Sequence, residues 1–590
     1  MKKIFRALTA LFLCFSLCLP GFGAEKAPAG ESFTLGAAPR LILTDLAPDA
    51  RAESTVSLAV SEFAAEGLSL TPVRGGAFAA RTGDLVVSAD AGLPREGYEI
   101  TVTPEQVFLR YSPGEPSPFY GGDRDHNGLL YGLRRVLKLF LLRDGRTLES
   151  GMISEAPLTN ERIFLLDCAR KYFTPDWICN LIRRISWLGF NGLELHLSDE
   201  QGLRADIWGG GELSWLCGST PASWVFDCPD PDEGKYLTAP ELDRIIRTAE
   251  EYHVEILPSL ESPGHCRHLC KALEAHVRKD PEFSFDFAGE TFRNVRSIAA
   301  PGDSNVLNLA DPAATAFFHR VLEDFAGFFG AYGCTKFNLC ADEVPEMFSP
   351  EAVTDYVNQS AALLQEKGWE VRVFSDPPAD RLDPSIGVVW WHRPEGPFPE
   401  NRKIYNASQE YSYYVLRKFN TPGYEDNPCW SLDARDPENI WWTFGGGTAE
   451  NILKNWDPTV LAGTERKPDR AAGAYYLLWC DYPGLTTEKD LWQEYGFQEK
   501  LLAHSIRCWT LSPRIDYEVL TEYGKKAGSY PGMEDCAKTP ALPEAPEITA
   551  RWGRDLCTLR RFLSGKEAGI LSKKEAAQPG VSYACLSVPG

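Results

Sequence analysis

Short apolar runs, rich in β-branched and aromatic residues, recur through the middle of the chain and predict buried β-strands. Eight such runs occur, at residues 163–166, 193–197, 254–260, 337–340, 371–374, 388–391, 404–405 and 474–479. Because several of them are almost entirely apolar, we expect both faces of these strands to be covered.

Helical periodicity separates the earlier runs and predicts helices over residues 174–188, 238–249 and 311–325. Each begins at a recognisable N-cap: Thr238 and Glu241 form a capping box, and a proline follows both Thr174 and Asp311. This alternation predicts an α/β fold, a (β/α)8 TIM-type barrel over residues 158–525. Only short segments separate the fifth, sixth and seventh strands, so a doubly wound open sheet is the structural alternative.

The regions on either side of the predicted barrel differ from it. Residues 25–157 predict a small α+β domain with four strands, at 41–43, 85–87, 98–102 and 107–111, and two helices, of which the second, at 129–141, is amphipathic. The C-terminal extension, residues 526–590, carries a proline-rich patch and one predicted helix, at 540–546 and 555–563. Its composition indicates no role.

The first 24 residues predict a signal peptide. Lys2, Lys3 and Arg6 precede an apolar stretch over 7–19, which is followed by small residues. We therefore expect an exported protein, secreted, periplasmic or at the cell surface. No later run reaches the roughly 18 uninterrupted apolar residues of a membrane span.

Cysteine usage leaves two interpretations open. Of the 16 cysteines, Cys14 and Cys18 lie in the predicted signal peptide, so 14 remain after it. Export permits disulfides, but Cys179, Cys340 and Cys480 stand inside apolar runs, where buried free thiols are the simpler expectation.

Composition narrows the class of partner. The chain has 590 residues with 82 acidic and 60 basic side chains, a net charge of −22. This excess argues against nucleic acid as the main partner, because phosphate binding needs clustered Lys and Arg. Aromatic residues make up 12% of the chain, and besides building a core they suit the apolar faces of sugar rings.

Polar and aromatic groups gather where the predicted strands end, which is where (β/α)8 barrels carry their active sites. These positions are Asp167, His196, Asp199, Glu261, His265, Asp342, Glu343, Asp376, Trp391, His392, 408–410, Trp479 and Asp481. Asp342 and Glu343 follow a buried strand side by side. Two adjacent carboxylates in a low-dielectric pocket disfavour joint ionisation, so one should keep its proton to higher pH, as a general acid requires.

Several motifs in one order resemble glycoside hydrolase family 20, the exo-acting β-N-acetylhexosaminidases and lacto-N-biosidases. In the predicted barrel they are Arg162…Asp167-Cys-Ala-Arg170, Leu195-His196-Leu197-Ser198-Asp199, Glu261-Ser-Pro-Gly-His265 and Asp342-Glu343-Val344. Two further stretches, Glu96-Gly-Tyr98 and Gly128-Leu-Leu-Tyr-Gly132, resemble the small domain that precedes the barrel in this family. The similarity spans roughly residues 95–510.

The resemblance implies a retaining, substrate-assisted mechanism, in which the substrate's acetamido carbonyl attacks C1 to give an oxazolinium ion. Glu343 would be the general acid/base, and Asp342 would hold the acetamido N–H. Asp199 and His265 would support this pair. The implied partner is a glycan or glycoconjugate with a terminal β-linked N-acetylhexosamine, and no cofactor or metal is implied.

The resemblance also implies residues that bind the sugar. Arg162 would bind ring hydroxyls O3 and O4 through its rigid donor fork, and Asp481 would accept from O4 and O6. The acetamido group would meet Trp391, or Trp390 in its place, Trp479, and Tyr414 with Tyr413 as the fallback.

The sequence departs from the family at three places. Cys340-Ala341 stands where a Gly-Gly pair is common and is expected to tighten the turn, Phe374 replaces a tryptophan after the fifth strand, and no acid follows Tyr414-Val415. The last difference leaves the preferred sugar open between N-acetylglucosamine, N-acetylgalactosamine and the disaccharide lacto-N-biose.

Three other interpretations compete. His265, Cys266, His268 and Cys270 have zinc-ligand types, although no Cys-x-x-Cys completes a tetrahedral set. A two-carboxylate retaining glycosidase would use Glu343 as acid and Glu410 as nucleophile. A secreted sugar-binding protein without catalysis is the third, but both members of the acidic pair are present.

Overall fold

The computed structural model describes residues 31–44, 49–143, 145–219, 232, 234–377, 380–391, 402–415, 448–461, 471–480, 488–493, 497–512 and 515–533. The predicted signal peptide, the predicted helix at 555–563 and Asp481 lie outside these residues. None of the helices described is long and apolar enough to cross a membrane.

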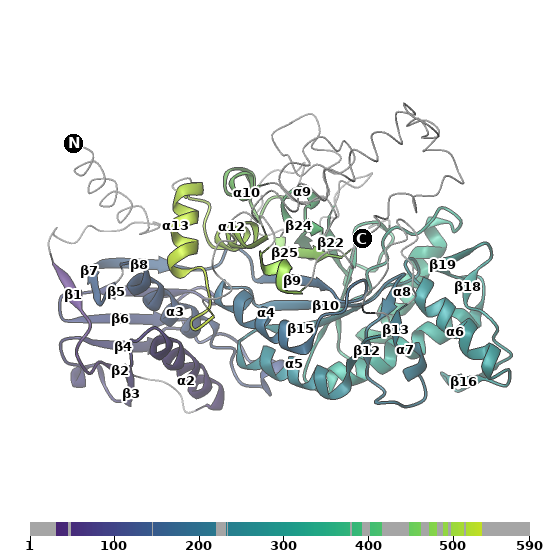
Figure 1. Cartoon of the computed structure of the whole chain (residues 1–590), viewed down its shortest axis with the longest axis horizontal. Coiled ribbons are helices and arrows are strands. Elements are labelled where there is room, and N and C mark those ends of the chain that lie inside the picture. Colours follow the sequence, from purple (N-terminus) through teal and green to yellow (C-terminus); the bar gives the residue numbers. More distant parts are fainter. Residues whose placement is uncertain are drawn as a thin grey trace, which may run out of the picture.

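A closed parallel barrel forms the centre of the molecule (Figure 1). Its strands, in order around the barrel, are β9 (Glu161–Asp167), β10 (Gly192–Ser198), β15 (Glu255–Leu260), β20 (Lys336–Asn338), β21 (Glu370–Phe374), β22 (Gly387–Trp390), β23 (Ile404–Asn406) and β25 (Ala471–Trp479). The last strand pairs with the first, from Gly473 opposite Glu161 to Leu478 opposite Leu166. This closure confirms the predicted (β/α)8 barrel and excludes the open sheet.

One additional strand was not predicted. β24 (Tyr413–Val415) pairs in parallel with the end of β25, with Tyr413 opposite Leu477 and Val415 opposite Trp479. Within β25, only the residues at its beginning pair with β23. The end of β25 therefore has a second neighbour at the carboxyl end of the barrel.

Helices follow the strands and include those predicted from their caps. They are α4 (Pro175–Trp187), α5 (Ala239–Glu251), α6 (Arg267–Lys279), α7 (Pro312–Gly330), α8 (Pro350–Gln365), α9 (Gln409–Ser412), α10 (Ala449–Asn455), α11 (Glu488–Gln493), α12 (Phe497–Trp509) and α13 (Tyr517–Ala527). Thr174 accepts from the backbone N–H of Trp177, Asp311 accepts from that of Ala313, and Thr238 with Glu241 forms the capping box. An N-cap of this kind stabilises a helix by about 1 kcal/mol.

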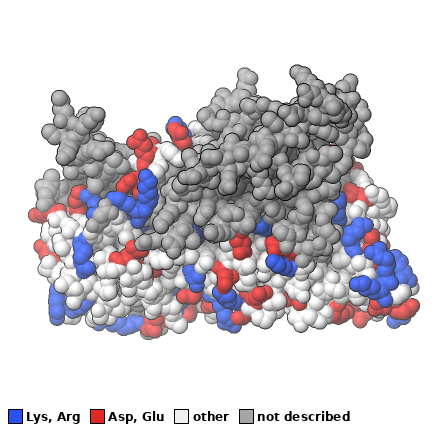
Figure 2. Space-filling model, viewed as in Figure 1, with Lys and Arg blue, Asp and Glu red and all other residues white. Residues whose placement is uncertain are grey.

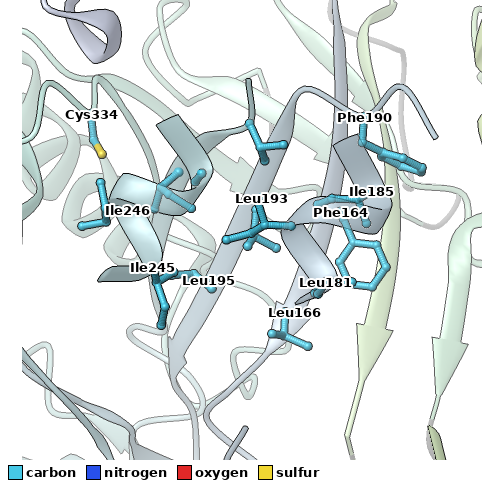
Figure 3. Packing of buried hydrophobic residues seen from close by; sticks show 14 of the residues in the cluster. Phe164, Leu166, Leu181, Ile185, Phe190, Leu193, Leu195, Ile245, Ile246 and Cys334 are labelled. Carbon is cyan, nitrogen blue, oxygen red and sulfur yellow. The ribbon is translucent and has the colours of Figure 1, made fainter. Parts of the chain in front are cut away.

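The apolar runs are explained by two cores, one on each face of the barrel strands. On the outer face, Phe164, Leu166, Leu193 and Leu195 pack against residues of α4 and α5, among them Leu181, Ile185, Ile245 and Ile246 (Figure 3). The alternate residues, such as Ile163, Leu165, Tyr475 and Leu477, fill the barrel interior. Burying each such aliphatic side chain stabilises the fold by roughly 1.5–3 kcal/mol.

The small N-terminal domain has the predicted α+β character. Its sheet has the order β3 (Thr71–Arg74), β2 (Arg40–Leu43), β4 (Asp84–Ala89), β6 (Gln106–Tyr111), β5 (Tyr98–Val102) and β8 (Gly151–Glu155), with helices α2 (Ala50–Ala65) and α3 (Asn127–Leu142). A separate pair joins β1 (Ser32–Thr34) to β7 (Thr147–Glu149). Near the end of the described chain, Lys526 of α13 donates to the carbonyl of Leu142.

Short strands that the sequence did not predict lie in the loops of the barrel. They are β11 (Gly202–Leu203), β12 (Ala205–Asp206), β13 (Gly218–Ser219), β14 (Leu237–Thr238), β16 (Ser284–Phe287), β17 (Glu290–Arg293), β18 (Ala299–Ala300) and β19 (Asp303–Leu307). In Figure 1 the hairpins that contain β16 to β19 lie at the end of the molecule opposite the small domain.

Two expectations about charge and cysteine can be compared with the described surface and core. Acidic and basic side chains are intermixed on the described part of the face in Figure 2. Each cysteine that the structure describes is a free thiol, and those at 179, 340 and 480 are buried as predicted.

Candidate active site

The loop that follows β20 carries Asp342 and Glu343 in a strained backbone. Cys340, Ala341 and Glu343 have φ values of 57°, 66° and 48°, in the left-handed region that L-residues other than glycine, Asn and Asp rarely adopt. This explains why a Gly-Gly pair would suit the same turn. Hydrogen bonds hold the loop: the carbonyl of Cys340 accepts from Phe374 N–H at 2.8 Å, and Glu343 N–H donates to Asp376 at 2.7 Å. Strain of this kind persists where the surroundings fix it, often at functional sites.

Asp342 is half-buried and presents its carboxylate to the mouth of the barrel. Its Oδ1 atom is inaccessible to solvent and has no hydrogen-bond partner. Burial is the main reason that the pKa of Asp342 is raised to about 7, and the negative charges of Asp376 and Glu343 add to this effect. The positive charge of His265 acts in the opposite direction. An unsatisfied buried acceptor of this kind is costly unless a ligand supplies the donor.

Glu343 has the opposite character. Its side chain is 57% exposed, and Oε2 lies 3.4 Å from Nε2 of His265. The hydrogen bond to His265 lowers the pKa of Glu343. Because the pKa of Asp342 is raised and that of Glu343 is lowered, Asp342 rather than Glu343, the predicted acid, holds the proton of the adjacent pair. Because the two groups interact strongly, the pair titrates as a unit.

His265 is fixed by carboxylates behind it. Nδ1 lies 2.6 Å from Glu200 and 3.1 Å from Asp199. Burial alone would lower the pKa of His265, but the charge of Asp199 and the hydrogen bonds raise it well above its ordinary value. Asp199 also accepts from His196 at 2.9 Å. The structure thus places His265 beside Glu343 and places Asp199, the other predicted supporting residue, behind His265.

The arginine at the mouth is Arg170, not Arg162. Arg170 pairs with Asp167 at 3.1 Å and with Asp199 at 2.9 Å, and its guanidinium lies 5.6 Å from the Trp479 ring centroid. Arg170 belongs to one of the motifs that resemble the family, but the sequence predicted no role for it.

Arg162 lies near the amino end of β9 and points away from the mouth. A strand rises about 3.3 Å per residue, so Arg162 lies roughly 16 Å below Asp167 at the carboxyl end. It is 1% exposed and forms an ion pair of 2.5 Å with Glu96 of the small domain. The predicted binding of sugar hydroxyls by Arg162 does not fit this position.

Aromatic side chains line one side of the mouth. Trp391 stacks on Tyr413, with ring centroids 6.1 Å apart and planes at 14°, and Tyr413 lies 6.0 Å from Trp479. The ring of Phe374 is also 6.0 Å from Trp479. These four residues belong to the cluster inside the barrel.

The alternative residues of the two predicted pairs lie elsewhere. Trp390 and Tyr414 belong to the outer core, where Tyr414 packs on Phe497 of α12 at 5.0 Å. Trp391 and the fallback Tyr413 are therefore the members that face the site.

Two further carboxylates reach the site from neighbouring strands. Asp376, after β21, accepts from Glu343 N–H and from Trp391 Nε1–H at 3.0 Å. Glu261, after β15, is buried, and its Oε2 atom has no hydrogen-bond partner. Both stood among the strand-end positions in the sequence, but nothing in their sequence context indicated these contacts.

The residues of two competing interpretations are not brought together. His268 Nε2–H donates to the carbonyl of Leu216 at 2.7 Å. Glu410 lies on α9, where its charge acts on Tyr411, and Tyr411 packs with the cluster around Trp456 and Leu520. Carboxylates do approach His196 and His265 closely enough to hold a metal ion, but Arg170 already pairs with Asp199 in that group.

Comparison with known proteins gives a consistent result. Residues 161–371 match the sequence model of the glycosyl hydrolase family 20 catalytic domain. The chain is 27% identical over 295 residues to a beta-hexosaminidase of Vibrio furnissii, covering 48% of this chain and 43% of that protein. It is 22% identical over 403 residues to a lacto-N-biosidase of Bifidobacterium bifidum, covering 62% and 30%. The chain thus spans less than half the length of these curated relatives.

Solved structures share the fold at low sequence identity. A β-N-acetylhexosaminidase from Bacteroides fragilis aligns with a TM-score of 0.58 at 17% identity, covering 94% of this chain and 97% of that one. The family 20 β-N-acetylhexosaminidase from Streptomyces coelicolor aligns with a TM-score of 0.60 at 17% identity, covering 88% and 97%. At this identity the likeness shows the fold alone.

Proposed function

We propose that this chain, which belongs to glycoside hydrolase family 20 through its barrel domain, releases terminal β-linked N-acetylhexosamine as an exo-acting, retaining glycosidase. The observation that carries the proposal is the buried, unsatisfied Oδ1 of Asp342 beside the exposed carboxylate of Glu343. An acetamido N–H supplies the donor that Asp342 lacks, and a glycosidic oxygen beside Glu343 receives its proton.

The reaction proceeds through the substrate's own acetamido group, as in the family's exception to two-carboxylate catalysis. The acetamido oxygen forms a bond to C1 while the bond from C1 to the leaving oxygen breaks, and Glu343 donates its proton to that oxygen. The resulting oxazolinium ion carries its positive charge next to the Asp342 carboxylate. Glu343 then takes a proton from water, the water oxygen bonds to C1, and the ring opens to the N-acetylhexosamine product.

The distribution of the proton between Asp342 and Glu343 fits this scheme. Before substrate binds, the shared proton lies on Asp342, whose pKa is raised to about 7. An arriving N–H donor favours the Asp342 carboxylate, so the proton passes to Glu343, where the leaving oxygen needs it. Binding then leaves the number of protons on the pair unchanged.

The aromatic wall supports recognition of the acetamido group. The ring of Tyr413 stacks on Trp391 and packs beside Trp479, so the three rings form an aromatic wall against which an acetamido methyl group would lie. Burial chiefly raises the pKa of Tyr413 well above its ordinary value, so its hydroxyl remains a donor for the acetamido oxygen. We assign the donor role to Tyr413 instead of Tyr414.

We assign the recognition of the ring hydroxyls to Arg170 instead of Arg162. Its planar guanidinium is held beside Asp167 and Asp199, and the fork geometry of arginine suits two adjacent hydroxyls. Asp481, outside the described residues, remains the proposed partner of O4 and O6.

A panel of nitrophenyl glycosides tests the function. We expect turnover of N-acetyl-β-glucosaminide or N-acetyl-β-galactosaminide and none of plain β-glucoside. Preferred turnover of a lacto-N-bioside would instead favour the lacto-N-biosidase activity, which one matched relative bears in its name. Absence of turnover on every member would favour a sugar-binding protein, and retained turnover in Glu343→Gln would remove Glu343 from the mechanism.

We further propose that the protein is exported through residues 1–24. The basic, apolar and small-residue segments of this stretch support the proposal. Fractionation of expressing cells, followed by N-terminal sequencing of the product, tests it. A cytoplasmic product that retains residue 1 would contradict it.

A further inference from the structure

We propose that Asp376 is a positioning residue that joins the catalytic acid to the acetamido pocket, by bonding Glu343 with one carboxylate oxygen and Trp391 with the other. The proposal rests on the function proposed above for Asp342 and Glu343. It assigns a role to a side chain that touches neither the reacting atoms nor the glycosidic oxygen.

The geometry of the link spans three neighbouring strands. Asp376 stands two residues after β21, Glu343 follows β20, and Trp391 follows β22. Oδ2 of Asp376 accepts from the backbone N–H of Glu343 at 2.7 Å, and Oδ1 accepts from Nε1–H of Trp391 at 3.0 Å. One carboxylate thus joins the loop that carries Glu343 to the residue that begins the loop after β22.

The bond to Glu343 acts on a strained backbone. Glu343 has a φ of 48°, a conformation that a glutamate leaves readily unless its surroundings hold it. A hydrogen bond to a charged acceptor is among the stronger ones available to a backbone N–H. Loss of this acceptor would let the peptide turn, and the carboxyl group of Glu343 would turn with it.

The bond to Trp391 sets the wall of the acetamido pocket. Trp391 is only half-buried, and it stacks on Tyr413 at an interplanar angle of 14°. The indole N–H is the polar group that fixes the rotation of this ring. Because the same carboxylate holds Glu343, the distance between the pocket wall and the acid is set by one side chain.

The charge of Asp376 has a second consequence at Asp342. Burial is the main cause of the raised pKa of Asp342, and the negative charge of Asp376 adds to it. The other charged or titratable groups that act on or beside Asp342 are His265, Glu343, Asp199, Glu261 and Tyr413. Removing the charge of Asp376 should therefore lower the pKa of Asp342, and with it the pH at which the pair loses its proton.

Three variants separate these effects. Asp376→Asn removes the charge and one acceptor, Asp376→Glu keeps the charge on a longer arm, and Asp383→Asn is the matched control. Asp383 lies on the segment between β21 and β22, and among the contacts described its carboxylate accepts hydrogen bonds from the backbone N–H and the hydroxyl of Ser385. Thermal unfolding establishes that each variant is folded before its kinetics are compared.

For Asp376→Asn we expect kcat to fall about 10–100-fold on an N-acetyl substrate, the range typical when a supporting hydrogen bond is lost. The alkaline limb of its kcat/KM profile should move to lower pH. In Asp376→Glu we expect a lower kcat and an alkaline limb at the same pH as in the wild type. Asp383→Asn should change neither kcat nor the position of the limb. An Asp376→Asn enzyme with wild-type kcat and an unmoved limb would overturn the proposal.

A spectroscopic readout distinguishes failure of this proposal from failure of the proposed function. The difference in fluorescence between the wild type and Trp391→Phe isolates the emission of Trp391. The same difference, measured in the Asp376→Asn background, should shift because the carboxylate no longer binds the indole N–H. An unchanged difference spectrum would overturn the link, even if the wild type proved inactive on every N-acetylhexosaminide.

Discussion

Nε2 of His265 lies 3.4 Å from Oε2 of Glu343, while Nδ1 of the same ring lies 2.6 Å from Oε2 of Glu200. The imidazole therefore links the exposed acid to buried carboxylates. The hydrogen bond from His265, together with its positive charge, lowers the pKa of Glu343 and leaves Asp342 as the member of the pair that holds the proton.

The link between His265 and Glu343 predicts a pH effect. In His265→Asn the cation is absent, so the pKa of Glu343 rises and the acid limb of kcat/KM moves to higher pH. We expect kcat to fall about 10–100-fold, as for other residues that orient a reacting group. His276, which stacks on Trp215 at 4.0 Å, supplies the control: His276→Asn should leave the acid limb in place. A limb that does not move in His265→Asn would contradict the assignment.

Asp342 should destabilise the fold at neutral pH. Its pKa rises from an ordinary 3.8 to about 7 on folding, so between these values the folded state binds more protons than the unfolded state. Stability contributed by the protonated form is thus full below pH 4 and is lost as the pH rises to 7. Asp342→Asn should therefore unfold at a higher temperature than the wild type at pH 8, with a gain on the order of a few kcal/mol.

The gain should disappear near pH 4, and kcat should fall by orders of magnitude because the lost charge acts on the transition state. Differential scanning calorimetry at both pH values measures the first effect. An Asp342→Asn protein with the same advantage at pH 4 and pH 8 would show that the pKa of Asp342 is not raised, and a rise in KM alone would contradict its role.

Substitution of Arg162 should lower the stability of the fold, whereas substitution of Arg170 should lower kcat/KM. Arg162→Leu leaves Glu96 buried without its partner, which costs about 3–5 kcal/mol, but it leaves the KM of the folded enzyme unchanged. The double variant Arg162→Leu/Glu96→Leu should recover part of the lost stability. Arg170→Lys should lower kcat/KM with little loss of stability, because lysine cannot reproduce the donor fork. Urea unfolding and initial rates on the same samples separate the two, and a raised KM in Arg162→Leu would restore it as a sugar ligand.

Gly264 should be intolerant of a side chain. A Cβ atom there would meet the carbonyl oxygen of Asp342 at 2.8 Å, closer than ordinary contact allows, so Gly264→Ala must displace the catalytic loop. We expect a loss of kcat of at least about tenfold, since misplacing a reacting group by even 1 Å is costly. At Gly327 of α7 a Cβ meets no atom within 4 Å. Gly327→Ala is therefore the control and should retain full activity, and equal activity in both variants would contradict a rigid loop.

The fold was predictable because its pattern is repeated. Most of the barrel strands are rich in apolar residues, and helices such as α4 and α5 begin at caps that can be read directly in the sequence. β24 was not predicted because it is only three residues long and is a strand through its pairing with β25, which no local sequence pattern indicates.

The site was predictable in outline only. Asp342, Glu343, Asp199 and His265 stand at strand ends and meet as expected, but which of two neighbours faces inward depends on strand register. Because neighbouring residues of a strand point to opposite faces, Trp391 and Tyr413 face the site, while Trp390 and Tyr414 face the outer core. The role of Arg162 was predicted wrongly because a motif gives the order of its residues along the chain but not which end of β9 each residue occupies. The link through Asp376 depends on distances between loops that no spacing in the sequence encodes.

Participation of the acetamido group is the central claim, and the most direct test is a series of nitrophenyl glycosides whose acetamido methyl carries zero, one, two or three fluorine atoms. Fluorine withdraws electrons from the carbonyl oxygen that attacks C1. We predict that log kcat/KM falls steadily with each fluorine, by several orders of magnitude across the series. Rates that stay constant along the series would contradict the account, because a protein carboxylate would then be the nucleophile.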